Sequence, residues 1–189
     1  MHTSPQIVEI QKKIAALREE LTQTRQAAPP EPVADYTFTS PDGNPVTLAS
    51  LFGDHRDLLV VHNMGQSCPY CTLWADGFIG FADHLANRAG FALTSPDDPA
   101  ALKEFSESRN WTFPVLSHAG TGFAKDMGFE PDPGKFWPGV SAFHKNDDGS
   151  IVRVAADHFG PSDDYCAVWH LFGLLKEGTD GWEPKYTYQ

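Results

Sequence analysis

Apolar residues recur with a helical period in the first 26 residues of the chain. Five of them lie three or four positions apart: Ile7, Ile10, Ile14, Leu17 and Leu21. This spacing puts them in one stripe and predicts a helix. A helix packed on its own domain and a helix that forms a homodimer both explain the stripe. The prolines within residues 27–32 then end the helix and indicate a linker.

Beyond the linker, short apolar runs alternate with amphipathic segments. The run from Leu58 to Met64 is nearly uninterrupted, which is typical of a central strand covered on both faces. Further strands are predicted at residues 36–38, 46–48, 91–95 and 113–116, and a β-hairpin at 140–143 and 151–155. Helices are predicted at 68–88, 99–109, 123–127 and 162–176, the last one capped by Ser162. This order predicts an α/β domain with a mixed central β-sheet flanked by helices and preceded by an N-terminal helix.

We therefore divide the chain into three parts. An N-terminal helix and linker cover residues 1–28, the main domain covers 29–178, and an extended C-terminal tail covers 179–189. Within the helix predicted at 68–88, a buried stripe is formed by Trp74, Phe78, Phe81 and Leu85. Gly77 and Gly80 lower the helix propensity there, and we interpret them as points of close helix–sheet packing.

The composition narrows the function classes. The chain has 189 residues and a net charge of −11, so nucleic acid and anionic membrane surfaces are poor partners. No segment approaches the ~20 apolar residues of a membrane span, and no basic N-terminal segment precedes an apolar run. Three cysteines are too few for a disulfide-stapled secreted domain. We expect a cytoplasmic protein whose thiols are kept reduced, and no cofactor is indicated.

The tetrapeptide Cys68-Pro69-Tyr70-Cys71 carries the candidate chemistry. It follows the buried strand by a short link, and Pro69 suits the first position of a helix. Cys68 is then at the helix N-terminus, whose unpaired N–H groups and dipole lower the pKa of its thiol. With few cations nearby in the sequence, we expect the helix terminus to cause most of that lowering. Cys71 lies one turn later on the same face, where it can resolve a mixed disulfide.

Other residues are candidates for supporting roles. Tyr70 and Trp74 are predicted to form an apolar rim for the substrate. His62 ends the central strand and is either a proton donor to the leaving thiolate or a hydrogen-bonded strand end. The loop with Pro138 and Gly139 precedes the hairpin and is predicted to lie against the cysteines, with a cis or a trans bond before Pro138. Asp76 is expected to make a structural hydrogen bond.

A zinc site is the competing interpretation of the cysteines. Cys166 and His170 are four residues apart on the last predicted helix, and with Cys68 and Cys71 they would make a Cys3His set. The Pro-Tyr insert between the first two cysteines fits a redox turn better than a zinc knuckle. We therefore predict no metal, and we interpret Cys166 as a core residue, with an extra resolving thiol as its alternative.

Together these motifs resemble the thioredoxin superfamily. Cys68-Pro69-Tyr70-Cys71 is similar to the motif of glutaredoxins, and residues 113–128 look like the peroxiredoxin branch. The chain most resembles a bacterial thioredoxin-like family catalogued as domain of unknown function 899, from about Asp35 to Gly178. The matching stretches are residues 36–38 with 41–43, 48–53, 68–71, 74–78, 111–114 and 138–141. The resemblance implies a thioredoxin-like fold and a site at the cysteine pair. Gly65 stands where peroxiredoxins place a threonine, three residues before the attacking cysteine.

Three hypotheses follow. The first is a thiol–disulfide oxidoreductase in which Cys68 attacks and Cys71 resolves. The second is a thiol peroxidase that uses Cys68. The third is a non-enzymatic binding or assembly module that keeps the fold. The first two require a disulfide or peroxide as substrate and an electron donor, which the sequence does not identify.

Overall fold

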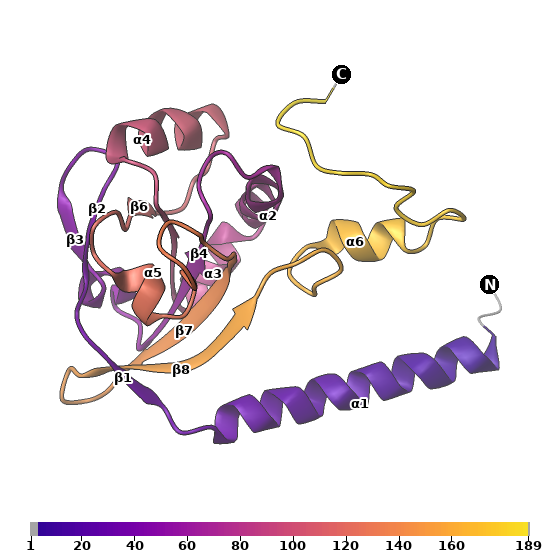
Figure 1. The fold of residues 1–189 in the computed structure, drawn as a ribbon. Helices are drawn as coiled ribbons and strands as arrows, with labels where there is room; N and C mark the ends of the chain where they lie inside the picture. Colours follow the sequence, from indigo (N-terminus) through magenta and orange to yellow (C-terminus); the bar gives the residue numbers. More distant parts are fainter. Residues whose placement is uncertain (1–3, 189) are drawn as a thin grey trace.

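An eight-stranded sheet forms the centre of the computed structural model, which describes residues 4–188 (Figure 1). The strand order is β1-β8-β7-β4-β5-β6-β2-β3. Strands β4, β5 and β6 run parallel, and the other neighbouring pairs are antiparallel. The strands are β1 (Glu31–Val33), β2 (Thr37–Thr39), β3 (Pro45–Thr47), β4 (Asp57–His62), β5 (Gly90–Ser95), β6 (Val115–Ser117), β7 (Gly139–Lys145) and β8 (Ile151–His158). The predicted mixed sheet is confirmed.

Helices cover both faces of this sheet, and a long one precedes it. They are α1 (Pro5–Ala27), the 3-10 helix η1 (Ala49–Phe52), α2 (Pro69–Ile79), α3 (Ala82–Arg88), α4 (Pro99–Ser108), α5 (Phe123–Asp126) and α6 (Ala167–Phe172). Side chains of α2, α3, α4 and α6 join one apolar cluster, and those of η1 and α5 join the other. The flanking helices and the N-terminal helix are thus as predicted.

Strand β4 lies between these two clusters. Leu58 and Val60 belong to the cluster on the η1 and α5 face, whereas Val61 belongs to the cluster under α2, with Leu59 packed against it. Successive side chains of a strand point to opposite faces, so an apolar run of this kind is buried on both sides. β4 pairs in parallel with β5 and antiparallel with β7, which confirms the predicted central strand.

Two of the predicted helices have different bounds. The helix predicted at 68–88 is two helices, because α2 ends at Ile79 and Phe81 leaves the helical region with φ −132° and ψ 16°. The apolar spacing continues across the break, so the sequence pattern does not reveal it. The predicted helix at 162–176 is shorter: Ser162 has φ +79°, and α6 begins after Cys166. Asp163 instead closes a turn by accepting hydrogen bonds from the backbone N–H groups of Tyr165 and Cys166.

Strand β1 is not foreseen by the sequence, because its proline suggests a linker. Pro32 lacks an N–H donor, but an edge strand tolerates this. β1 pairs with β8 at the edge of the sheet, and Glu31 forms an ion pair with Arg153. The boundaries at residues 28/29 and 178/179 stay a prediction.

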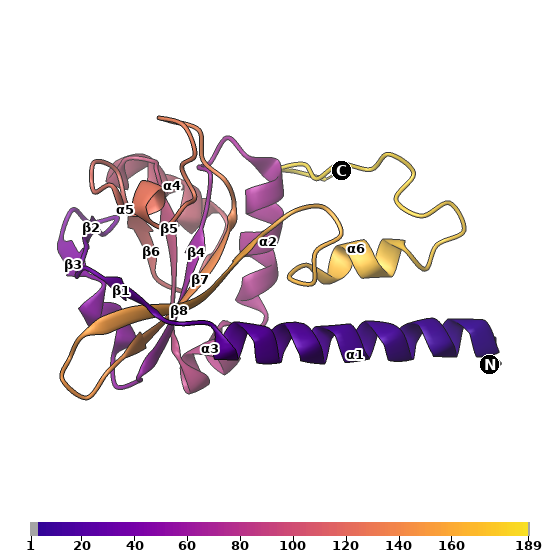
Figure 2. The same cartoon turned by 60° about the horizontal axis from the view of Figure 1, so that its bottom comes forward.

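Helix α1 extends past the sheet and has no buried residue (Figure 2). Its apolar stripe is 42% to 63% exposed, so the interpretation that the stripe packs on its own domain is wrong. Two arginines connect the helix to the domain instead: Arg18 pairs with Asp164, and Arg25 with Asp157. None of the helices in residues 4–188 is both long and apolar enough to cross a membrane.

Two glycines provide a matched test of packing. A Cβ at Gly139 would lie 2.3 Å from the Asp157 carbonyl oxygen and 2.3 Å from the Phe129 ring, so Gly139→Ala should destabilise the fold by about 2–3 kcal/mol. A Cβ at Gly77 meets nothing within 4 Å, so the interpretation of close packing there is wrong, and the same holds for Gly80. Gly77→Ala should therefore stabilise α2 by about 0.5–1 kcal/mol. Urea unfolding of both variants measures these changes, and equal midpoints would contradict the geometry.

Candidate functional site

Cys68 is the N-cap of α2, at the carboxyl end of the central strand. β4 ends at His62, a short loop follows, and Pro69 occupies the first helical position as predicted. Cys68 has extended backbone angles, φ −101° and ψ 104°, so its sulfur turns back over the first turn of the helix. The Cys68 sulfur therefore faces the free N–H groups of that turn and accepts a hydrogen bond from one of them, that of Cys71.

Each sulfur of the motif accepts a hydrogen bond from a backbone N–H group. The Cys71 N–H donates to the Cys68 Sγ over 3.1 Å. The Met64 N–H is directed at the Cys71 Sγ, with 3.5 Å between the two atoms. Both residues are buried, with 9% of Cys68 and 3% of Cys71 exposed, and both are free thiols. The structure thus shows a reduced pair in which Cys68 is the more accessible sulfur.

The environment shifts the pKa values of the two thiols in opposite directions. The Cys71 thiol lowers the pKa of Cys68 to about 7, and the backbone N–H groups of Cys71 and Tyr70 add to this against the effect of burial. The pKa of Cys71 is strongly raised, first by its hydrogen bond to Cys68 and then by burial. The expectation that the helix terminus dominates is therefore corrected, because the partner thiol has the larger effect. The Cys68 thiol therefore ionises at a lower pH than the Cys71 thiol.

Asp97 braces the loop that carries the cysteines. Its carboxylate accepts hydrogen bonds from the Gln66 N–H at 2.8 Å and from the Ser95 hydroxyl at 2.7 Å. Its carbonyl accepts one from the Ser117 hydroxyl at 2.6 Å. These residues meet because the carboxyl ends of parallel β4, β5 and β6 share one edge of the sheet. Sequence reasoning missed Asp97, although its place just after a buried strand was a usable signal.

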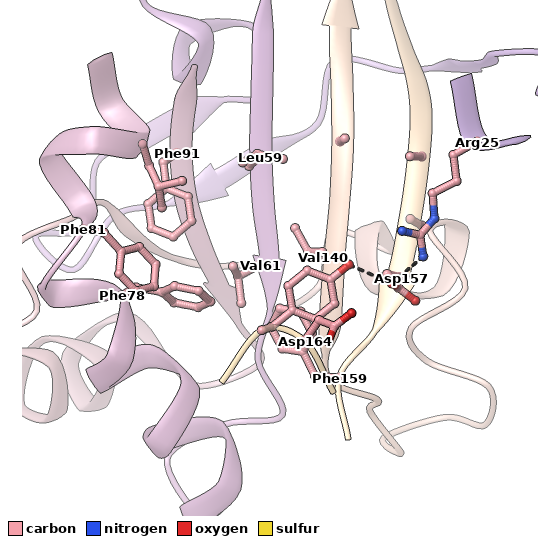
Figure 3. A pocket seen from close by; sticks show the side chains of 15 residues that line it. Arg25, Leu59, Val61, Phe78, Phe81, Phe91, Val140, Asp157, Phe159 and Asp164 are labelled. Atoms are coloured by element: carbon pink, nitrogen blue, oxygen red, sulfur yellow. Dashed lines mark hydrogen bonds and ion pairs between the residues drawn. The ribbon is translucent and has the colours of Figure 1, made fainter. Parts of the chain in front are cut away.

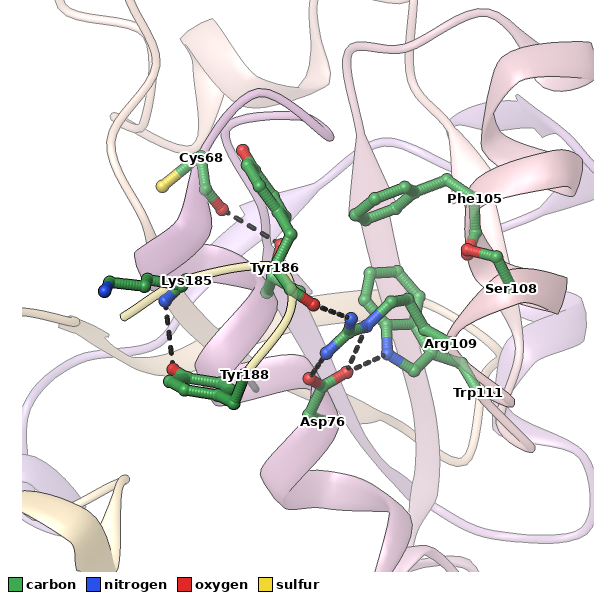
Figure 4. Close-up of polar contacts among 10 residues, drawn as sticks. Cys68, Asp76, Phe105, Ser108, Arg109, Trp111, Lys185, Tyr186 and Tyr188 are labelled. Carbon is green, nitrogen blue, oxygen red and sulfur yellow. Dashed lines mark hydrogen bonds and ion pairs between the residues drawn. The ribbon is translucent and has the colours of Figure 1, made fainter. Parts of the chain in front are cut away.

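The Asp76 side chain, on α2, accepts hydrogen bonds, as expected. It accepts from the Arg109 guanidinium and from the Trp111 indole N–H at 2.9 Å. Arg109 also donates to the Tyr186 carbonyl at 2.7 Å, which ties the C-terminal tail to α2 and α4 (Figure 4). The aspartate thus orients an arginine that holds the tail.

The tail brings the Tyr186 side chain beside the start of α2 (Figure 4). Burial raises the pKa of Tyr186, and the nearby thiols of Cys68 and Cys71 raise it further. Its ring also contacts Phe105 edge to face, with 6.3 Å between centroids. The tail was predicted only as extended chain, so this contact was missed. The aromatic residues Trp182, Tyr186 and Tyr188 were the available signal.

The two residues predicted to form an apolar rim differ in their exposure. Tyr70 is half-buried and stacks on Trp169 with 6.1 Å between centroids. Trp74 is only 3% exposed and lies in the core cluster beneath α2. A side chain that solvent does not reach cannot form the rim of a substrate site, so that prediction for Trp74 is wrong.

His62 lies on the opposite face of β4 from α2. Its Nε2 is 2.9 Å from the Ser141 hydroxyl, and its ring stacks on Phe129 with 3.9 Å between centroids. Burial holds the pKa of His62 well below its usual range, so the ring is neutral. Of the two roles that the sequence left open, the geometry matches the hydrogen-bonded strand end and not the proton donor to the thiolate.

Pro138 and Gly139 lie at the same edge of the sheet as the cysteine loop. Gly139 is paired with His62, and the Pro138 carbonyl accepts a hydrogen bond from the Phe159 N–H at 2.9 Å. The bond before Pro138 is trans, and residues 4–188 contain no cis peptide bond. The loop thus enters β7 beside the end of β4, although no direct contact with a sulfur is established.

The Cys3His set left open by the sequence is not assembled. Cys166 is buried in the core cluster with Trp169, and His170 faces Asp164, with 3.2 Å between the Nε2 and Oδ1 atoms. Across residues 4–188, no three ligating side chains come within reach of a common metal ion. Cys166 is confirmed as a core residue.

A separate hollow of about 380 Å³ lies on the sheet face between α3 and β8 (Figure 3). Its walls are mainly apolar, with Phe78, Phe91 and Val140 among them, and Arg25 and Asp157 lie at one end. Val61 and Val140, which adjoin His62 and Gly139, are among its lining residues, and neither cysteine lines it. The hollow is therefore distinct from the thiol site.

The chain is similar in sequence and in fold to proteins named as peroxiredoxins or peroxidoxins. The chain is 32% identical over 141 residues to a Mycobacterium tuberculosis protein named "Putative peroxiredoxin Rv2521", covering 70% of this chain and 87% of that one. The crystal structure of peroxidoxin BcpB from the same organism is 25% identical and has a TM-score of 0.55, over 68% of this chain and 84% of that one. Reduced Prx3 of Vibrio vulnificus, in complex with H2O2, is 18% identical with a TM-score of 0.56, over 72% and 90%.

These comparisons define the chain as a thioredoxin-fold protein of the peroxiredoxin-like class, and they support an oxidoreductase function in general. Within that class, the chain belongs to the family described as "Bacterial protein of unknown function (DUF899)", whose model matches residues 4–188. The resemblance drawn from the sequence is thereby confirmed, together with the predicted fold.

The pKa of Cys68 is directly testable. Alkylation of Cys68 by iodoacetamide, followed by peptide mass spectrometry, should rise with pH around a midpoint of about 7. Cys71→Ala removes the thiol that lowers this pKa most, so the midpoint should move toward the ~8.5 of an ordinary thiol. Cys166→Ser should leave it in place. A midpoint near 8.5 in the unchanged protein would contradict the proposed charge state.

The position of Tyr186 beside the start of α2 makes a second prediction (Figure 4). Tyr186→Ala should speed the reaction of Cys68 with a bulky maleimide severalfold more than its reaction with iodoacetamide, because the ring limits access by size. Tyr188→Ala is the matched control, since the Tyr188 hydroxyl accepts only from the Lys185 N–H in this segment. Equal ratios of the two rates in all three proteins would show that Tyr186 does not screen the thiol.

Proposed function

We propose that this chain is a thiol–disulfide oxidoreductase whose reactive pair is Cys68 and Cys71. The observation that carries the proposal is the hydrogen bond from the Cys71 N–H to the Cys68 Sγ, over 3.1 Å. The opposite pKa shifts of the two thiols accompany it. One sulfur is thereby prepared as a nucleophile, and the other is held as a protonated neighbour one helical turn away.

In the first step the Cys68 thiolate attacks a disulfide of the substrate. A bond forms between Cys68 and one substrate sulfur, and the other substrate sulfur leaves as a thiolate. The enzyme and the substrate are then joined by a mixed disulfide. Removal of the negative charge at Cys68 also removes the main cause of the raised pKa of Cys71.

In the second step Cys71 loses its proton and attacks the Cys68 sulfur. The remaining substrate sulfur leaves as a thiolate, so the substrate has gained two electrons and the enzyme holds a Cys68–Cys71 disulfide. An external dithiol then reduces this disulfide by the reverse exchange. The proposed partners are therefore a protein or small-molecule disulfide and a dithiol donor. We place the protein in the cytoplasm, where thiols are kept reduced.

A thiol peroxidase is the second candidate, and the 32% identical relative named as a peroxiredoxin favours it. The small exposed fraction of Cys68 also suits a small oxidant better than a protein disulfide. In this reaction Cys68 attacks the peroxide, an alcohol or water leaves, and Cys68 becomes a sulfenic acid. Cys71 then displaces water and forms the same disulfide. Gly65 lacks the hydroxyl that peroxiredoxins place at that position.

One set of variants separates the candidates. Mild oxidation with a small disulfide should lower the free-thiol count by two, and peptide mass spectrometry should find the Cys68–Cys71 bond. Cys68→Ser should abolish this change, Cys71→Ser should trap a mixed disulfide, and Cys166→Ser should behave as the unchanged protein. Rapid consumption of hydrogen peroxide with dithiothreitol, lost in Cys68→Ser, would favour the peroxidase. Cysteines that react with neither oxidant would contradict both candidates and favour a binding module.

A further inference from the structure

The apolar stripe of α1 is exposed along its whole length. Its five side chains are exposed by 48% at Ile7, 49% at Ile10, 42% at Ile14, 63% at Leu17 and 47% at Leu21. Isolated exposed apolar residues are common, but a continuous stripe on one helix usually marks an interface. The helix stands clear of the sheet along most of its length (Figure 2).

We propose that α1 pairs antiparallel with α1 of a second copy of this chain. The stripe has the three- and four-residue spacing with which helices interdigitate, and its length from Ile7 to Leu21 gives a seam of about 21 Å. In the antiparallel alignment, Ile14 of one copy lies opposite Leu17 of the other, and Ile10 lies opposite Leu21. Each apolar pair occurs twice because the arrangement is two-fold symmetric.

The charged side chains on the two flanks of the stripe differ in their contacts with the domain. One flank is bound to the domain, and the other is accessible to a second copy. Arg18 and Arg25 are on one flank, where they pair with Asp164 and Asp157 of the domain. Lys13 and Glu20 are on the other flank. Within residues 4–188 neither of them pairs with the domain, and the Nζ of Lys13 is 3.8 Å from Glu9 on the same helix. The domain thus binds one flank and leaves the stripe and the other flank accessible.

The charges on the accessible flank favour the antiparallel alignment. There, Lys13 of each copy faces Glu20 of the other, which gives two opposite-charge contacts. In a parallel pair, Lys13 would face Arg18 of the second copy, and these like charges would repel. Arg18 is also engaged with Asp164 already. Sequence spacing alone did not identify the partner of the stripe. The contacts of Arg18 and Arg25 with the domain decide which flank is accessible to a second copy.

Sedimentation of the full chain tests the proposal. It should show a monomer–dimer equilibrium at micromolar to submillimolar concentrations, and Ile14→Glu with Leu17→Glu should give a monomer. Both positions are exposed in this structure, so the domain should stay folded. Unchanged alkylation of Cys68 and an unchanged urea midpoint would confirm this. A monomer at all concentrations in the unchanged protein, or a dimer that survives the double substitution, would overturn the proposal.

Charge exchange tests the direction of the helices. Lys13→Glu should weaken the dimer about tenfold, because two weak attractions become repulsions. Adding Glu20→Lys in the same chain should restore the affinity by reversing both partners. Lys12→Glu is the matched control, since Lys12 lies on the side of the helix away from the stripe and should change little. A dimer strengthened by Lys13→Glu would instead show parallel helices and overturn the antiparallel arrangement.

Discussion

The buried end of β4 is the constraint on which the thiol site depends. Its side chains are held between two apolar clusters, and its edges are paired with β5 and β7. The chain leaves this strand at His62 and has six residues in which to reach Pro69. Asp97 fixes the path of that loop from the neighbouring strand end. Cys68 therefore begins α2 at a position set by the sheet and not by the loop itself.

The reactivity of the pair arises within a few atoms of this position. The effects that lower the pKa of Cys68 come from the Cys71 thiol and from backbone N–H groups, and no cationic side chain is among them. This is consistent with a strongly acidic chain, since the site needs no basic residue to form a thiolate. The same interaction raises the pKa of Cys71. In the exchange that we propose, attack by Cys68 comes first and prepares Cys71 to follow, within one turn of α2.

Two segments outside the sheet are held to the domain by arginine side chains. Arg109, oriented by Asp76, holds the C-terminal tail so that Tyr186 lies near the thiols. At the other end of the chain, α1 is connected to the domain by Arg18 and Arg25 while its apolar stripe stays exposed. The C-terminal tail thus lies near the start of α2, and α1 leaves an apolar surface exposed at the other end of the chain.

The sequence by itself determined the elements whose signals are local. The apolar run of β4, the hairpin of β7 and β8, and the redox turn of Cys68 to Cys71 each follow from periodicity or from the demands of a helix start. Only the tertiary structure decided the roles of His62, Trp74, Asp97 and Tyr186. Their environments depend on which strand ends share an edge and which face each side chain takes, and contacts such as Arg109 with Tyr186 join residues far apart in the chain. Spacing along a sequence carries no information about such contacts, because they are set by the packing of the whole sheet.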